Sequence, residues 1–94
     1  DALLNLYEQL YKAYSQRQQN RDAYRQLINS VIPDLDKALI LTRAAYDRGR
    51  LKYQDWIAAQ QELLSAKQRM IESASNTLLN QTIIEQLTAA PLTH

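Results

Sequence analysis

The sequence predicts an all-α fold, a long antiparallel α-helical hairpin whose first helix is kinked near Pro33. Three observations carry this prediction. The 94 residues include one Gly and two Pro, too few turn residues for a β-sandwich or a Rossmann-type unit. Hydrophobic residues make up 46% of the chain, which excludes a disordered tail. Apolar residues recur at intervals of three and four, the spacing of one helix face.

The first helix is expected over about residues 2–48. It contains a polar interval, Ser15–Asp22, in which no turn residue occurs. A continuous helix is therefore favoured, with the interval either solvated or a weak point. Tyr7, Tyr11 and Tyr14 lie at helical spacing, and such an aromatic stripe is more typical of a core than of a binding site.

Pro33 is the strong helix breaker within this first segment. Proline lacks a backbone donor and disfavours helical geometry in the residue before it. We therefore predict a kink or short break at Ser30–Pro33, after which Ser30 could cap a new helix. Asp34 and Asp36 would then favour the first turn of that helix.

The tip of the hairpin is expected at residues 48–53. Gly49 is the only Gly in the chain, and glycine readily takes the positive φ that ends a helix. Four basic residues surround this turn, near a helix C-terminus where the helix dipole favours cations: Arg43, Arg48, Arg50 and Lys52.

The second helix is expected over about residues 53–89, ending near Thr88–Ala90 before Pro91. Two adjacent heptad stripes run along it, which predicts that it touches neighbours on both sides. Because two helices alone bury little surface, further hairpins are expected, from other copies or from missing parts of a parent protein. The first stripe is Trp56, Leu63, Met70, Thr77 and Ile84, and the second is Ile57, Leu64, Ile71 and Leu78.

Composition excludes several classes of function. Eleven basic against ten acidic residues give a net charge of +1, without the excess typical of nucleic-acid binders. Cys is absent and the only His is His94, so imidazole or thiolate metal sites and haem sites are excluded. No apolar run approaches the length of about 18 residues that suggests a membrane-spanning helix.

The sequence offers no catalytic residues, and neither a cofactor nor a metal ion is expected. There is no nucleophile–base pair and no phosphate-binding loop. The acidic residues are scattered along the helices, so we interpret them as solvated charges rather than an acid–base or metal cluster. They include Asp22, Asp34, Asp36 and Glu62. The sequence therefore predicts a protein that is not an enzyme.

The segment Ala45–Leu64 reads AYDRGRLKYQDWIAAQQELL, which contains Tyr-x-x-Gly followed by Asp-x-x-x-Ala-Gln-x-x-Leu. This pattern resembles the periplasmic hairpin tip of the TolC-like outer membrane efflux proteins, most of all their heavy-metal efflux branch. Upstream, VIPDLDKALILTRAAY resembles the family's approach to the tip. Downstream, Glu85-Gln86-Leu87-Thr88-Ala89 stands where the family has Glu-x-Leu-Thr-Gly. The resemblance covers about residues 30–92 well and residues 1–29 loosely.

The resemblance implies a trimeric parent protein, with a β-barrel in the outer membrane of a Gram-negative bacterium and an α-helical tunnel in the periplasm. This chain would be one periplasmic hairpin of that tunnel, an excised part without the barrel strands. Its tip would dock a periplasmic adaptor (membrane fusion) protein, and an inner-membrane transporter would act through the adaptor. The residues that match the docking tip are Tyr46, Arg48, Gly49, Arg50 and Lys52. The exported substrate, a metal ion or a drug, stays open.

Asp55 stands where the family places a tip aspartate that can face the channel axis, so the resemblance implies a channel constriction there. The simpler interpretation is an aspartate that caps the second helix or complements its dipole. Leu51 replaces a basic residue and Ala58 a second acid that some relatives carry, so the gate of those relatives is not expected here. Tyr46, like Tyr53 and Trp56, is equally interpreted as a packing residue of the tip.

Two alternatives stay open beside the efflux channel. One is the hairpin of the periplasmic adaptor itself, which also has long heptad helices but a different tip pattern. The other is a coiled-coil scaffold or dimerisation module, which would show heptads without the tip motif. In each case we expect self-association, because two apolar stripes need to be covered.

Overall fold

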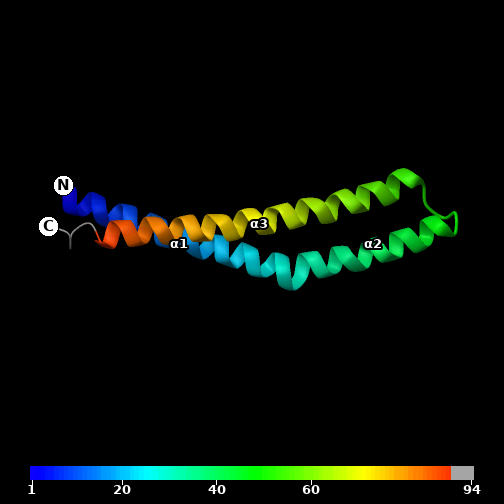
Figure 1. Cartoon of the computed structure of the whole chain (residues 1–94), viewed down its shortest axis with the longest axis horizontal. Coiled ribbons are helices and arrows are strands. Elements are labelled where there is room, and N and C mark those ends of the chain that lie inside the picture. The colour runs from blue at the N-terminus through cyan, green and yellow to red at the C-terminus, as the bar shows by residue number, and fades with distance from the viewer. Residues whose placement is uncertain (90–94) are drawn as a thin grey trace.

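The computed structural model describes residues 1–89, which form one antiparallel helical hairpin (Figure 1). The first arm consists of α1 (Ala2–Gln26), a π-helical turn η1 (Leu27–Val31) and α2 (Ile32–Asp47), and the second arm is α3 (Tyr53–Ala89). The molecule measures 69 × 19 × 16 Å. The described part contains no β-strand, so the predicted all-α hairpin is confirmed. Ala90, Pro91 and His94 lie outside the described residues.

α1 runs without interruption through the polar interval Ser15–Asp22, as predicted. It begins at Asp1, whose side chain accepts a hydrogen bond from the backbone N–H of Leu3 at 3.2 Å. The interval is neither wholly solvated nor a weak point, however. Arg17 and Asn20 are half-buried on the side that faces α3, where their side chains donate hydrogen bonds to polar side chains of α3.

The first arm passes Pro33 without a break. It widens into the π-helical turn η1, in which Ile32 donates its backbone N–H to the carbonyl of Leu27, five residues earlier. Pro33 then lies in the first turn of α2, where a missing backbone donor is tolerated. The first arm changes direction in this region (Figure 1), as expected at a π-helical turn.

The predicted cap at Ser30 is wrong. Ser30 lies inside η1 and is exposed, and the residue that precedes α2 is Val31, which makes no side-chain capping bond. The physical reason is that the helical hydrogen bonding never stops, because the π turn takes up the extra residue. A side-chain cap is therefore not needed. Asp34 does lie in the first turn of α2, as predicted, whereas Asp36 lies beyond that turn.

The seam between the two arms follows the first predicted stripe of α3. All five of its residues are buried or half-buried. The other seam positions of α3, apart from Leu87 near its end, carry smaller or polar side chains, which lets the arms approach closely. From the first arm, the buried apolar residues are Ala13 of α1 and Leu27 of η1. The intervening seam positions of α3 are Ala59, Ala66, Ser73, Asn80 and Leu87.

The second predicted stripe of α3 is covered within the hairpin only at Ile57, which is half-buried near the tip. Leu64, Ile71 and Leu78 are 58%, 60% and 70% exposed. Each of them follows a seam residue by one position, so its side chain is turned about 100° away from the first arm. The expectation that α3 touches neighbours on both sides is not met within one chain, because a hairpin supplies only one other arm.

The prediction that Tyr7, Tyr11 and Tyr14 form a core stripe is also wrong. These side chains are 60%, 76% and 45% exposed. The residues of α1 that turn toward α3 are their neighbours in sequence, such as Leu10 and Ala13. Helical spacing showed correctly that the tyrosines share a side of the helix, but not that this side faces away from the seam.

Candidate docking site at the hairpin tip

The tip begins where α2 ends in a glycine turn. Gly49 has a φ of +72°, the left-handed conformation predicted for it. Its N–H donates to the carbonyl of Tyr46 at 2.9 Å, and the N–H of Arg50 donates to the carbonyl of Ala45 at 2.9 Å. This pair of bonds is the Schellman motif, which satisfies the last carbonyls of a helix. The turn therefore has a single backbone geometry that is set by Gly49.

The tip ends where α3 begins, and Asp55 caps that start. Its Oδ2 accepts a hydrogen bond from the backbone N–H of Lys52 at 3.1 Å, and the backbone N–H of Asp55 donates to the carbonyl of Lys52 at 3.0 Å. An acidic side chain in the first turn also complements the helix dipole. The structure thus supports the capping interpretation of Asp55, while a channel constriction stays a prediction.

Three aromatic side chains hold the two arms together just below the tip. Tyr46 of α2 stacks on Trp56 of α3, with ring centroids 5.6 Å apart and planes 10° apart. Tyr53 lies edge-on to Trp56 at 5.8 Å and tilted against Tyr46 at 5.9 Å. The interpretation of these residues as tip packing is confirmed. Trp56 Nε1 is shielded from solvent without a hydrogen-bond partner in the described part of the chain, so the packing of the indole outweighs that loss.

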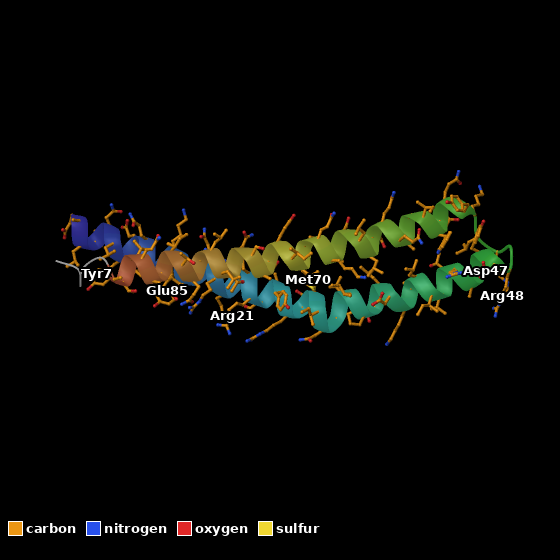
Figure 2. All side chains as sticks on the ribbon, in the orientation of Figure 1. Tyr7, Arg21, Asp47, Arg48, Met70 and Glu85 are labelled. Atoms are coloured by element: carbon orange, nitrogen blue, oxygen red, sulfur yellow. The ribbon has the colours of Figure 1, made fainter. Side chains whose placement is uncertain are left out.

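The outer surface of the tip is mainly cationic. The basic side chains predicted there are all exposed, and Figure 2 places Arg48 beyond the end of α2, away from the seam. Over residues 46–55, three cations against two anions leave a charge of +1, and Asp55 is engaged by backbone. The exposed cations of this end are Arg43, Arg48, Arg50 and Lys52.

The five predicted docking residues therefore divide into two roles. Tyr46 is half-buried in the aromatic cluster and supports the turn from below. Arg48, Gly49, Arg50 and Lys52 lie on the exposed surface of the turn. No atom lies within 4 Å of the place where a side chain at Gly49 would begin, so the outside of the turn is open to a partner.

A polar cluster in the middle of the seam was not predicted. Asn80 of α3 is 7% exposed, the only buried polar residue among those described. Its Oδ1 accepts from Asn20 at 2.9 Å, and its Nδ2 donates to Gln16 at 3.3 Å. Beside it, Arg17 donates to the side chain of Gln81. The available signal was that the polar interval of the first arm and the polar pair Asn80-Gln81 fall opposite each other in an antiparallel hairpin.

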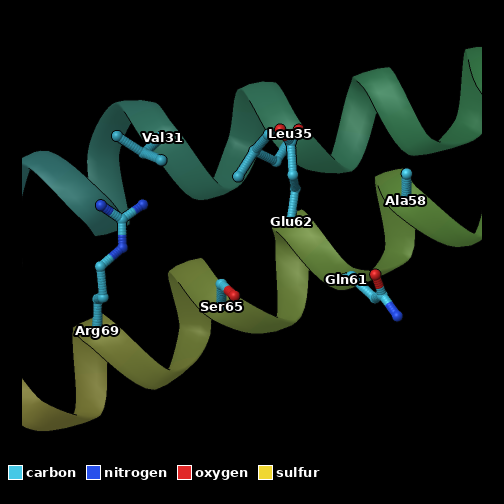
Figure 3. A pocket seen from close by; sticks show the side chains of 7 residues that line it. All are labelled: Val31, Leu35, Ala58, Gln61, Glu62, Ser65 and Arg69. Atoms are coloured by element: carbon cyan, nitrogen blue, oxygen red, sulfur yellow. The ribbon is translucent and has the colours of Figure 1, made fainter.

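A groove of about 500 Å³ lies between the arms near the π turn, away from the tip. Val31 and Leu35 line it from the first arm (Figure 3). From α3, Glu62 extends toward Leu35 and Arg69 toward Val31, while Gln61 points away. The lining is mixed and the groove contains none of the predicted docking residues, so it adds nothing to the tip site.

Comparisons with protein families, with curated proteins and with solved structures returned no match to this chain. Among the described residues, no helix is both long and apolar enough to cross a membrane. The same part of the chain has no group of three or more His, Cys, Asp or Glu side chains that could hold a metal ion. The candidate site is therefore defined by the tip geometry and the motif order.

Proposed function

We propose that this chain is a periplasmic hairpin of an outer membrane efflux channel, a segment of its helical tunnel that docks a periplasmic adaptor protein. The observation that supports the proposal best is the tip, where a rigid glycine turn presents Arg48, Arg50 and Lys52 to the outside. The motif order around that turn, Tyr-x-x-Gly and then Asp-x-x-x-Ala-Gln-x-x-Leu, is similar to the TolC-like family. The role is geometric, without catalysis.

The tip can dock a partner through its shape and its charge. The open space outside Gly49 lets a partner helix come close to the backbone. The guanidinium groups of Arg48 and Arg50 can donate several hydrogen bonds each, to carboxylates or to carbonyls at a helix end of the partner. The aromatic cluster below keeps this surface from reorganising, so little ordering is needed on binding.

In the trimeric parent, three copies of Asp55 would come together around the channel axis. Close carboxylates repel one another and attract cations, so such a ring would favour cationic cargo at the channel entrance. This part of the proposal is compatible with the helix cap, because the cap occupies only Oδ2. An inner-membrane transporter would deliver the exported substrate through the adaptor.

The test is photo-crosslinking in cells with the intact parent protein. A photoreactive amino acid at Arg48 should capture an adaptor protein, whereas the same amino acid at Ser65, an exposed control on α3, should not. Capture at Ser65 alone would contradict docking by the tip. No adaptor at either position would overturn the efflux-channel proposal in favour of a plain helical scaffold.

A charge-reversal pair sharpens the same experiment. Arg48→Glu together with Arg50→Glu should lower adaptor capture at least tenfold, because two donors become acceptors at the docking surface. Lys37→Glu, an exposed reversal on α2, is the matched control and should leave capture unchanged. Equal capture by the unmodified parent, the Arg48→Glu/Arg50→Glu variant and the Lys37→Glu variant would show that the cations of the tip do not contribute to docking.

A coiled-coil scaffold is the second candidate function. The exposed second stripe of α3 favours it, because apolar residues at heptad spacing on a helix surface are what a partner helix covers. It requires no particular chemistry at the tip. The crosslinking experiment therefore separates the two candidates.

A further inference from the structure

We propose that the 94-residue chain by itself, outside the trimeric parent of the proposed function, binds a second copy through one face of the hairpin, so that two hairpins stack face to face as a four-helix bundle. This face, here called the apolar face, consists of the residues that follow seam residues by one position on both arms. Its apolar members include Tyr7, Tyr14 and Ile28 of the first arm and Leu64, Ile71 and Leu78 of α3. All six are exposed in the single chain.

The exposed stripe of the first arm (Tyr7, Tyr14 and Ile28) and that of α3 (Leu64, Ile71 and Leu78) lie on the same side of the hairpin. Arg21 and Arg25 of α1 line one groove of about 430 Å³ together with Ala74 and Leu78 of α3. Arg21 is one heptad beyond Tyr14 and one heptad before Ile28, so the groove joins the stripe of α1 to the stripe of α3. These stripes therefore form a continuous face rather than two opposite edges.

The other side of the hairpin is polar at the height of this groove, although Leu79 and Ile83 are exposed on it nearer the chain ends. A groove at the same height on that side is lined by Ala23 and Gln26 of α1 and by Glu72 and Asn76 of α3, among others. In the middle of the hairpin one face is thus suited to water and the other to burial. Such an asymmetric ribbon is expected to cover its apolar face with another layer of helices.

The angle between the seam and the apolar face fits a bundle of four helices. One residue of an α-helix turns through about 100°, so each arm has two contact lines separated by about that angle. In a four-helix bundle every helix touches two neighbours that lie at about a right angle to each other. A second hairpin placed on the apolar face supplies the missing neighbour of both arms at once.

The exposed surface area of the single chain also fits a second copy as the partner that covers the apolar face. The single chain exposes 7221 Å², whereas a compact monomer of 10.9 kDa exposes about 5,600 Å². The excess is about 1,600 Å², and a standard stable interface needs about 800 Å² from each partner. Among residues 1–89, only five apolar residues are buried inside the hairpin, namely Ala13, Leu27, Leu63, Ala66 and Ile84. A dimer would therefore supply the core that the monomer lacks.

The charges on this face point to a second copy rather than to a membrane or an acidic partner. Residues that follow the seam include cations such as Arg25 and Lys67 and anions such as Asp36 and Glu85. A face with both signs can pair with itself when the two copies are arranged to bring them together. In contrast, an anionic membrane surface would select cations alone.

The same charges favour parallel copies, related by a two-fold axis along the hairpin. In that arrangement the first arm of one copy lies on α3 of the other at the same height. Leu35 and Ser65 line one groove, so Asp36 stands close in height to Lys67 of the second copy. Likewise, Arg17 bonds to Gln81 and Asn20 to Asn80, which places Ile28 at about the height of Ile71.

Analytical ultracentrifugation of the 94-residue chain tests the stoichiometry. We expect a species of twice 10.9 kDa. Ile71→Glu on the apolar face should weaken the dimer at least tenfold, and Asn76→Glu on the polar face should not. A helical monomer at all concentrations overturns the proposal, as does a trimer. Arg48→Glu at the tip should leave the dimer intact, so failure of the adaptor proposal does not affect this one.

Charge exchange keeps the proposal testable if Ile71→Glu fails to fold. Lys67→Asp should weaken the dimer by about tenfold because it faces Asp36 of the second copy, and adding Asp36→Lys should restore it. Both residues are exposed in the single chain, so neither change should disturb the hairpin. Weakening without restoration would contradict the parallel arrangement.

Disulfide trapping tests the arrangement directly, because the natural sequence has no Cys. An Ile28→Cys chain mixed with an Ile71→Cys chain should form a mixed disulfide dimer on oxidation. An Ala23→Cys chain mixed with an Asn76→Cys chain is the matched control, since these two residues line the groove on the polar face. Trapping of the control pair but not of the first pair would overturn the proposal.

Discussion

The hairpin holds its two arms together in different ways at the tip and in the middle. At the tip, Tyr46, Tyr53 and Trp56 make apolar and stacking contacts, and the backbone caps of Gly49 and Asp55 fix the turn. In the middle, amide and guanidinium side chains meet across the seam. The tip therefore depends on packing and turn geometry, while the middle depends on directional hydrogen bonds.

This difference suggests a division of roles: the packing at the tip stabilises the hairpin, whereas the hydrogen bonds in the middle fix the register of the two arms. Apolar contacts are nearly non-directional and tolerate a shift of one helix along the other. A buried Asn is satisfied only when its partner stands at one position, so it selects one register at some loss of stability. Asn80 has partners on two residues of α1, Asn20 and Gln16, one turn apart. A shift of the arms by one turn would leave Asn80 buried with at most one of these two partners.

The largest effect is expected from Trp56→Ala, which breaks the packing at the tip. Two ring contacts are lost, and the free energy of unfolding should fall by about 2 kcal/mol. Urea unfolding followed by circular dichroism, at one fixed chain concentration, measures it. Gln54→Ala, an exposed neighbour, is the control and should change stability by less than about 0.5 kcal/mol. Equal effects for the two variants would show that the aromatic cluster does not hold the tip.

Gly49→Ala tests the turn itself. An alanine at a φ of +72° is strained by about 1–2 kcal/mol, although no atom stands in the way of its Cβ. Gly49→Asn should lose less than half as much, because asparagine tolerates the left-handed region. The same unfolding experiment compares the three proteins. An Asn variant as unstable as the Ala variant would point to lost backbone hydrogen bonds instead of φ strain.

A double-mutant cycle on Asn20→Ala and Asn80→Ala probes the middle of the seam. The coupling free energy should be about 1 kcal/mol, the value of a hydrogen bond shielded from water. The exposed pair Gln18 and Asp22, bonded along α1 at 3.0 Å, is the control and should couple by less than about 0.5 kcal/mol. A coupling near zero at the seam would contradict its role in setting the register.

Asp55→Asn is expected to have the smallest effect. It keeps a side-chain acceptor for the N–H of Lys52 but removes the negative charge at the start of α3, a loss of about 0.5 kcal/mol. The loss should shrink in high salt, because exposed charges are screened. Glu62→Gln in the body of α3 is the comparison, and it should show no such loss. A salt-independent loss would mean that the hydrogen bond matters more than the charge.

Much of the fold follows from short-range patterns. Gly49 and the four nearby cations placed the tip, and the two heptad stripes that begin at Trp56 and Ile57 showed which residues of α3 could make helix contacts, but not which stripe meets the first arm. Such features depend on neighbours within one or two turns, which a sequence displays directly. The failures came from long-range partners. Tyr7 and Tyr14 look like core residues by spacing, and only the position of the other arm shows that they face outward.

The sequence by itself determined that two long helices form, where the chain reverses and which residues cap the reversal, because helix propensity, glycine and proline act locally. Only the tertiary structure decided that Pro33 is accommodated by a π-helical turn and not by a break, since the hydrogen-bonding pattern depends on keeping the arm against α3. It also decided that Asn80 meets Asn20 across the seam and that Leu64, Ile71 and Leu78 of the second apolar stripe stay exposed. These outcomes depend on which side of each helix meets the other arm, and that choice is made in three dimensions.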